Sequence, residues 1–95
     1  MLNKEYEKVR ISYEKALEID PKSGIIFSNL SETYLRLKYF LKAIDMACKA
    51  MLHISNDHIL YNKVLMRKAK ALYHQDKFDE CMAVLNKIKK DSNEK

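Results

Sequence analysis

Apolar residues recur along this chain every three or four positions, which places them on one face of a helix with 3.6 residues per turn. The pattern predicts five helices, over about 3–20, 23–38, 39–54, 57–75 and 76–90. The clearest break is Asp20-Pro21, because proline disfavours the α conformation in the residue before it. All the connections are short, so successive helices should be antiparallel neighbours.

The polar residues at the breaks predict where three of these helices begin. Ser23, Asp57 and Asp76 are the side chains expected to cap the second, fourth and fifth helices. The apolar stripes predict the core. On the last four helices the expected core positions are Phe27, Leu30, Ser31, Tyr34 and Leu37; Phe40, Ala43, Ile44, Ala47, Ala50, Met51 and Ile54; Tyr61, Leu65, Ala69 and Leu72; and Phe78, Cys81, Met82, Leu85 and Ile88.

The stripes also repeat at long range. A step of 34 residues carries Tyr6 to Phe40, and a step of 38 carries Phe40 to Phe78 and Ala43 to Cys81. A period near 34 is typical of stacked helix pairs, in which one unit buries its apolar face only against the next. The sequence therefore predicts an all-α fold of antiparallel helix-turn-helix repeats, stacked as a short right-handed solenoid of about five helices.

This phasing describes a single domain, residues 1–95. It contains a half repeat at 3–21 that supplies only a second helix, full repeats at 22–57 and 58–90, and a tail at 91–95 expected to fray. The longer step exceeds the shorter by four residues, close to one helical turn. We expect residues 58–61 to add a first turn to the fourth helix, with a lengthened third helix as the alternative.

Composition narrows the classes of function. Lys and Arg exceed Asp and Glu by 18 to 13, which favours acidic partners without identifying them. A single Gly excludes a glycine-rich phosphate loop, and no spacing of Cys or His suits zinc, so we expect no catalysis, cofactor or metal. No apolar run approaches 18 residues and the N-terminal segment is too charged for a secretory signal, so we expect a cytoplasmic protein without membrane partners.

The segment YEKALEIDP, residues 13–21, resembles the end of a tetratricopeptide repeat, and the 34-residue period agrees with that family's unit. The resemblance extends from Lys4 to about Lys90. Lys38 and Asp76 depart from the family pattern, because they stand where a turn glycine is usual. The resemblance implies a helical stack that binds other proteins.

A narrower resemblance concerns chaperone cofactors of the carboxylate-clamp type, which include large immunophilins and the chaperone-organising protein. In FSNLSETYLRL, residues 27–37, Asn29 stands at the position of the clamp asparagine. In NKVLMRKAKAL, residues 62–72, Lys63 and Arg67 stand at the positions of the clamp lysine and arginine. The resemblance implies that these three residues bind the acidic C-terminal tail of a heat-shock chaperone.

Helical spacing places further ionisable side chains beside these residues. Along one face of the fourth helix, at i, i+4, i+7 and i+11, lie Lys63, Arg67, Lys70 and His74. Arg67 offers a planar fork that suits a carboxylate, whereas Lys63 is a mobile point charge. We expect Lys70, His74 and, from the second helix, Arg36 to support peptide binding electrostatically.

Other interpretations remain open. A basic stripe opposite an apolar one also characterises any solvated amphipathic helix. The family's clamp takes a Lys and an Asn from a first helix that precedes this chain's half repeat, so the chain is either a fragment of a larger protein, such as a peptidyl-prolyl isomerase, or has lost that helix. Self-association through an uncovered end helix, as a homodimer, is a further alternative.

Nucleic-acid binding is the competing hypothesis from another class. Net charge and the cluster Lys87, Lys89 and Lys90 motivate it. The sequence carries no known DNA- or RNA-binding signature, and its aromatic residues fall on the predicted core stripes, so we do not expect this function.

Overall fold

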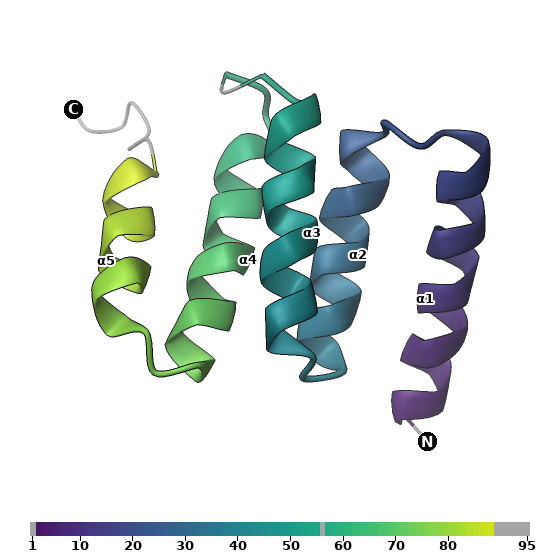
Figure 1. Cartoon of the computed structure of the whole chain (residues 1–95), viewed down its shortest axis with the longest axis horizontal. Helices are drawn as coiled ribbons and strands as arrows, with labels where there is room; N and C mark the ends of the chain where they lie inside the picture. The colour runs from purple at the N-terminus through teal and green to yellow at the C-terminus, as the bar shows by residue number, and fades with distance from the viewer. Residues whose placement is uncertain (1, 56, 89–95) are drawn as a thin grey trace.

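The computed structural model describes residues 2–55 and 57–88. They form five α-helices, α1 (Leu2–Ile19), α2 (Gly24–Arg36), α3 (Phe40–His53), α4 (Tyr61–His74) and α5 (Phe78–Lys87). The helices stand side by side as antiparallel rods in one row (Figure 1), and the part of the chain described contains no strand. The predicted all-α fold with antiparallel neighbours is confirmed. The tail expected to fray lies outside the described residues.

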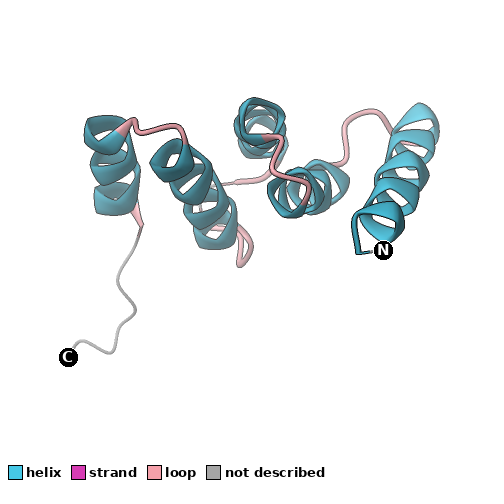
Figure 2. Cartoon of the chain, turned by 90° about the horizontal axis from the view of Figure 1, so that it is seen from below, coloured by secondary structure: helices cyan, strands magenta, loops and turns pink. Residues whose placement is uncertain are grey.

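Packing in the row is not strictly pairwise. Each helix contacts its neighbour in sequence, and α2 also contacts α4. The end-on view of Figure 2 shows why, since α3 is offset to one side of the row and leaves α2 and α4 next to each other. As a result α4 packs against α2 and α3 on one side and against α5 on the other. None of the described helices combines the length and the apolar character that crossing a bilayer requires.

One of the three predicted helix caps is present. The Ser23 hydroxyl oxygen accepts a hydrogen bond from the Ile26 amide at 3.2 Å, as expected of an N-cap. The other two predictions are wrong. Helix α4 begins at Tyr61, beyond Asp57, and its N-cap position is Leu60. Asp76 belongs to the end of α4, while α5 has Lys77 at its N-cap position with no side-chain cap.

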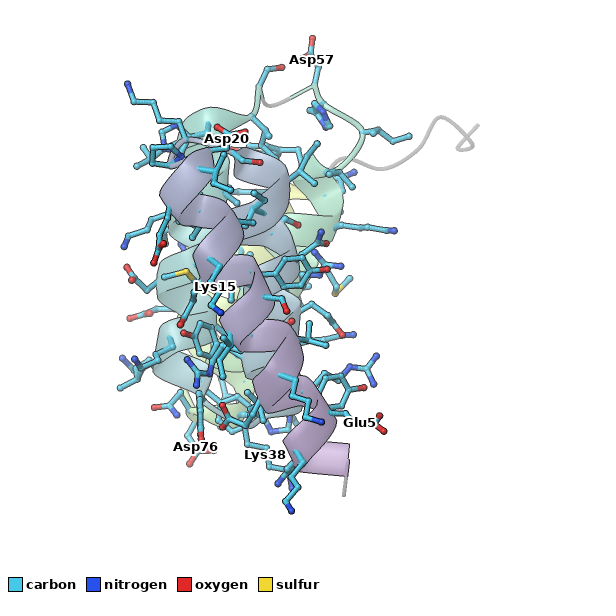
Figure 3. All side chains as sticks on the ribbon, turned by 90° about the vertical axis from the view of Figure 1, so that its right-hand side faces the viewer. Glu5, Lys15, Asp20, Lys38, Asp57 and Asp76 are labelled. Atoms are coloured by element: carbon cyan, nitrogen blue, oxygen red, sulfur yellow. The ribbon has the colours of Figure 1, made fainter. Side chains whose placement is uncertain are left out.

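In each of the turns after α2 and α4, one residue adopts the left-handed backbone conformation. Lys38 has φ 67° and Asp76 has φ 60°. Figure 3 shows the two residues at the same end of the helix rods. After α2 the Tyr39 amide donates to the Tyr34 carbonyl at 2.9 Å, and the Lys38 amide donates to the Leu35 carbonyl at 3.0 Å. The same pair of bonds closes α4. Both turns are Schellman motifs, which explains why the family resemblance expects glycine at these positions.

The four residues by which the second repeat step exceeds the first, near 58–61, lengthen the connection between α3 and α4 and do not lengthen a helix. Helix α3 ends at His53 and α4 begins at Tyr61, so neither expected location is correct. Between them, the His58 amide donates to the Ser55 carbonyl at 3.0 Å and the Tyr61 amide to the His58 carbonyl at 2.9 Å. The Leu60 amide donates to His58 Nδ1 at 3.0 Å. This side-chain acceptor competes with the backbone bonds of a continuing helix.

Small residues let the two helices of each pair approach closely. Ala43, Ala47 and Ala50 of α3 are fully buried against neighbouring helices. The Ser31 hydroxyl donates to the Ala43 carbonyl at 2.8 Å. In the pair formed by α4 and α5 the second helix supplies the donor, because the Cys81 thiol of α5 donates to the Ala69 carbonyl of α4 at 3.3 Å. A Cβ on Gly24 would lie 2.6 Å from Ile54 Cγ2, so the α2–α3 junction accepts only glycine without rearrangement.

The core prediction holds for α2, is incomplete for α4 and fails in part for α5. On α4 the side chains of Val64 and Ala71, outside the predicted stripe, are fully buried because this helix packs on two sides. On α5 the predicted core residues Phe78 and Met82 are 51% and 56% exposed, and Val84 is buried instead. Helix α5 has only α4 as a neighbour among the described residues, so only one face is covered.

Candidate peptide-binding face

The six predicted binding residues lie on α2 and α4, the two helices that contact each other across the row. Since α2 and α4 are separated by one antiparallel helix, they run in the same direction and their side chains keep the same order along the stack. We define the α2–α4 face by the following residues: Asn29, Glu32, Arg36, Lys63, Arg67, Lys70 and His74.

Arg67 joins the two helices. Its Nη1 donates to the Ser28 carbonyl at 2.9 Å and to the Ser28 hydroxyl at 2.5 Å. Its Nε lies 3.2 Å from Glu32 Oε1, and the side chain is only 17% exposed. The guanidinium therefore already holds two residues of α2, a contact that the sequence analysis did not predict.

Glu32 is the acidic centre of this face. Its Oε1 faces Arg67, and its Oε2 accepts a hydrogen bond from Arg36 Nε at 2.7 Å. The bond to Glu32 raises the pKa of Arg36 above its ordinary value, so this guanidinium is always charged. Spacing of four residues in the sequence indicates the pair with Arg36. The pair with Arg67 has no such signal, because it depends on the distance between two helices.

The imidazole of His74 packs against aromatic side chains, in addition to being an ionisable group. The rings of His74 and Phe40 are stacked, with centroids 4.6 Å apart and an angle of 9° between planes. Tyr73 meets the same imidazole edge-on, at 5.8 Å and 84°. The sequence placed Phe40 on the core stripe of α3, and the structure shows that this ring also supports a side chain of α4.

A cavity of about 190 Å³ lies between the two helices. Glu32, Leu35 and Arg36 of α2 line it, together with Phe40, Lys70 and His74. The structure thus brings Arg36, Lys70 and His74 to one cavity and Arg67 to the carboxylate at its edge. These four of the six predicted residues are close together.

The other two predicted residues lie about one helical turn away. Asn29 precedes Glu32 by three residues on α2, and Lys63 precedes Arg67 by four on α4. Lys63 is exposed and Asn29 is half-buried. The whole face carries four cationic side chains and one carboxylate, so it favours an anionic ligand. Within residues 2–55 and 57–88, no group of three or more His, Cys, Asp and Glu is arranged to hold a metal ion.

No family model matches the chain. A stretch of 42 residues is 40% identical to human Tetratricopeptide repeat protein 28. The match covers 44% of this chain and 2% of the human protein, so the chain corresponds to a small part of that relative. Together, this similarity and the row of packed antiparallel helices support a tetratricopeptide-like helical repeat.

Proposed function

We propose that this chain is a non-catalytic protein-interaction module that binds the acidic C-terminal tail of a partner at the α2–α4 face. Similarity to a tetratricopeptide repeat protein supports a role in protein binding, since stacked repeats present extended surfaces to other proteins. The motifs around Asn29, Lys63 and Arg67 support the narrower hypothesis that the partner is a cytoplasmic heat-shock chaperone.

The position of Arg67 carries this proposal. A guanidinium has five N–H donors, and Arg67 uses Nε and Nη1 for its contacts with α2. Among the described residues no contact engages its Nη2, which leaves two donors for a ligand carboxylate. Lys63 and Lys70 lie on the same helix face, one turn to either side. A terminal carboxylate and an acidic side chain would find separate cations there.

Glu32 opposes this binding. A tail carboxylate must share Arg67 with Glu32 or displace it, so the affinity should be lower than an unpaired arginine would provide. A charge-assisted hydrogen bond contributes about 1.5–3 kcal/mol when partly desolvated, against about 0–1 kcal/mol for an exposed ion pair. Arg67 is mostly buried, so its bond to the tail falls in the larger range. Lys63 and Lys70 are exposed, so their contacts fall in the smaller one.

The test is titration calorimetry with the peptide Glu-Glu-Val-Asp against the wild-type chain, Arg67→Ala and Glu32→Gln. We expect Arg67→Ala to weaken binding about tenfold or more, because one charge-assisted bond is lost. We expect Glu32→Gln to tighten binding, because the competing carboxylate is removed while the side-chain volume is kept. Amidation of the peptide's C-terminus should weaken binding to all three.

Lys49→Ala is the matched control, because Lys49 pairs with Asp45 on α3, away from the α2–α4 face. Since Arg67 also ties α2 to α4, circular dichroism must show that Arg67→Ala remains folded. Lys63→Ala provides a second test without this difficulty, because the side chain is exposed. Equal peptide binding by the wild type, Arg67→Ala and Lys63→Ala would refute tail capture at this face.

A further inference from the structure

The three histidines of the chain have different surroundings, and the structure describes all of them. His53 ends α3 and stacks on Phe27, with ring centroids 5.8 Å apart. His58 lies in the connection before α4, where its Nδ1 accepts a hydrogen bond from a backbone amide. His74 is the histidine that lines the cavity of about 190 Å³ between α2 and α4. Its protonation therefore changes the charge of the candidate binding site.

The imidazole of His74 is held by its faces and not by its nitrogens. Its ring stacks on that of Phe40, and Tyr73 meets it edge-on. Within residues 2–55 and 57–88, no hydrogen bond engages its Nδ1 or Nε2. The side chain is also exposed, so protons reach it from solvent. Both nitrogens are thus available, and in the protonated ring both are donors for an anionic ligand.

The titratable and charged groups that face His74 belong to three helices. They are Glu32 and Arg36 of α2, Lys70 and Tyr73 of α4, and Cys81 of α5. Helix α3 contributes the neutral ring of Phe40. Near neutral pH the phenol and the thiol are ordinarily uncharged, so the two cations and the one carboxylate determine the local charge. Arg36 and Lys70 oppose a further positive charge, whereas Glu32 favours it.

The carboxylate of Glu32 is shared between two guanidiniums. Its Oε1 lies 3.2 Å from Arg67 Nε, and its Oε2 accepts the hydrogen bond from Arg36. Lys70 has no ion pair within the part of the chain that the structure describes. The cavity and its edge therefore carry an excess of positive charge before His74 takes up a proton. An anion that enters would offset this charge and favour the imidazolium.

We infer that His74 couples capture of the acidic tail to the uptake of a proton. A tail carboxylate in the cavity offsets the charges of Arg36 and Lys70 and pairs with the protonated ring of His74. Because coupling is reciprocal, the protonated chain binds the tail more tightly than the neutral one. The inference rests on the proposed function, since the ligand is the same acidic tail, and it makes the site sensitive to pH.

The sign follows from which groups change charge. Histidine ordinarily titrates between about pH 5 and 8, whereas Asp and Glu titrate near pH 4. A fall from about pH 8 to about pH 6 therefore adds a cation to the α2–α4 face and leaves the tail ionised. His74 is exposed, so the gain is that of an exposed ion pair, and we expect the affinity to rise about two- to fivefold.

Titration calorimetry in two buffers of equal pH and different ionisation enthalpy measures the proton directly. The ligand is Glu-Glu-Val-Asp with an acetylated N-terminus, because a free amine would itself titrate near neutral pH. The apparent binding enthalpy of the wild-type chain should differ between the buffers, by the amount that corresponds to a fraction of a proton per complex. His74→Phe keeps a ring on Phe40 and removes the nitrogens, so its enthalpy should be the same in both buffers.

His53→Phe is the matched control. His53 also stacks on a phenylalanine of a neighbouring helix, but it lies at the other end of the rods, because α3 and α4 are antiparallel and both residues end their helices (Figure 1). Proton uptake should persist in this variant. In NMR titrations of the full chain, the peptide should move the midpoint of the His74 ring signals to higher pH and leave those of His53 unchanged.

The outcomes separate this inference from the proposed function. Tail binding that depends on Arg67 and Lys63 but takes up no proton would overturn the inference and leave tail capture intact. Proton uptake that persists in His74→Phe would assign the titration to another group, which also overturns it. If the wild-type chain fails to bind the peptide at both about pH 6 and about pH 8, both proposals fall.

Discussion

Lys38 and Asp76 show how single residues carry conformational strain in this fold. Both adopt positive φ in the turns that reverse the chain after α2 and α4. An L-residue in the left-handed region costs about 1 kcal/mol relative to glycine, because its Cβ approaches the following carbonyl oxygen. Aspartate is tolerated better than lysine, because a short polar side chain can bond locally to the backbone.

Replacement of Lys38 by glycine should therefore stabilise the protein. We expect Lys38→Gly to raise the free energy of unfolding by about 0.5–1 kcal/mol, and Asp76→Gly to raise it by less. Urea denaturation followed by circular dichroism measures both changes.

Gln75→Gly is the matched control for these variants. Gln75 adjoins Asp76 and has φ −92°, which any residue adopts. Glycine at this position gains nothing in the folded state and increases the entropy of the unfolded chain, so it should lower stability. An increase in stability for Gln75→Gly equal to that for Lys38→Gly would show that the left-handed backbone is not the cause.

At the scale of elements, α1 is held to the stack by polar contacts as well as apolar ones. Its only helical neighbour among the described elements is α2. The Tyr34 hydroxyl donates to Glu14 Oε2 at 2.8 Å, and the Tyr39 hydroxyl donates to Glu7 Oε2 at 2.9 Å. Arg10 bridges the same two carboxylates, to Glu7 at 2.7 Å and Glu14 at 2.9 Å. Two tyrosines and one arginine thus fix the angle at which α1 docks.

Alkaline pH should weaken this attachment. Burial, and then the hydrogen bond to Glu14, raise the pKa of Tyr34 to about 12. An unfolded tyrosine ionises near pH 10, while the folded one remains protonated to about pH 12. The unfolded state therefore loses its proton first, and the free energy of unfolding should fall as pH rises between these values.

Tyr34→Phe tests this dependence. At pH 8 the variant should be less stable by about 1.5–3 kcal/mol, since a hydrogen bond to a carboxylate is lost. Between pH 10 and pH 12 it should lose stability less steeply than the wild type, because the titrating group is absent. Urea denaturation at a series of pH values measures both effects. The control is Tyr73→Phe, at an exposed ring, and an equally altered slope in that variant would contradict the assignment to Tyr34.

At the scale of the whole molecule, stability should decrease from the middle of the row toward its ends. Helices α2, α3 and α4 each contact at least two other helices, whereas α1 and α5 each contact one. In a linear stack each unit is stabilised mainly by its nearest neighbours. Opening of an end helix therefore breaks fewer contacts than opening of a central one.

Native-state hydrogen exchange should reveal this gradient. We expect the slowest exchange at amides of α3 around Ala43 and Ala47, and faster exchange along α5. Uniform protection of all five helices would mean that the row unfolds as one cooperative unit, contrary to this expectation.

Much of the architecture follows from local spacing. The number and order of the helices, their antiparallel arrangement and the Ser23 cap depend on residues a few positions apart, so the pattern of apolar and turn residues predicts them. Within the candidate face, the side of α4 that carries Lys63 and Arg67 was predictable from the same periodicity. As contacts of a bound peptide, all six residues stay predictions: Asn29, Arg36, Lys63, Arg67, Lys70 and His74.

Other features depend on which helices meet and how closely. Arg67 binds Glu32 because α2 and α4 touch across the offset α3, and no spacing along the chain encodes that distance. Phe78 lies on the same stripe as buried Cys81 yet remains exposed, because burial requires a neighbour on that side. Helical periodicity is a property of one segment and can be read from its residues, whereas pairing and burial belong to surfaces that exist only after the helices have packed.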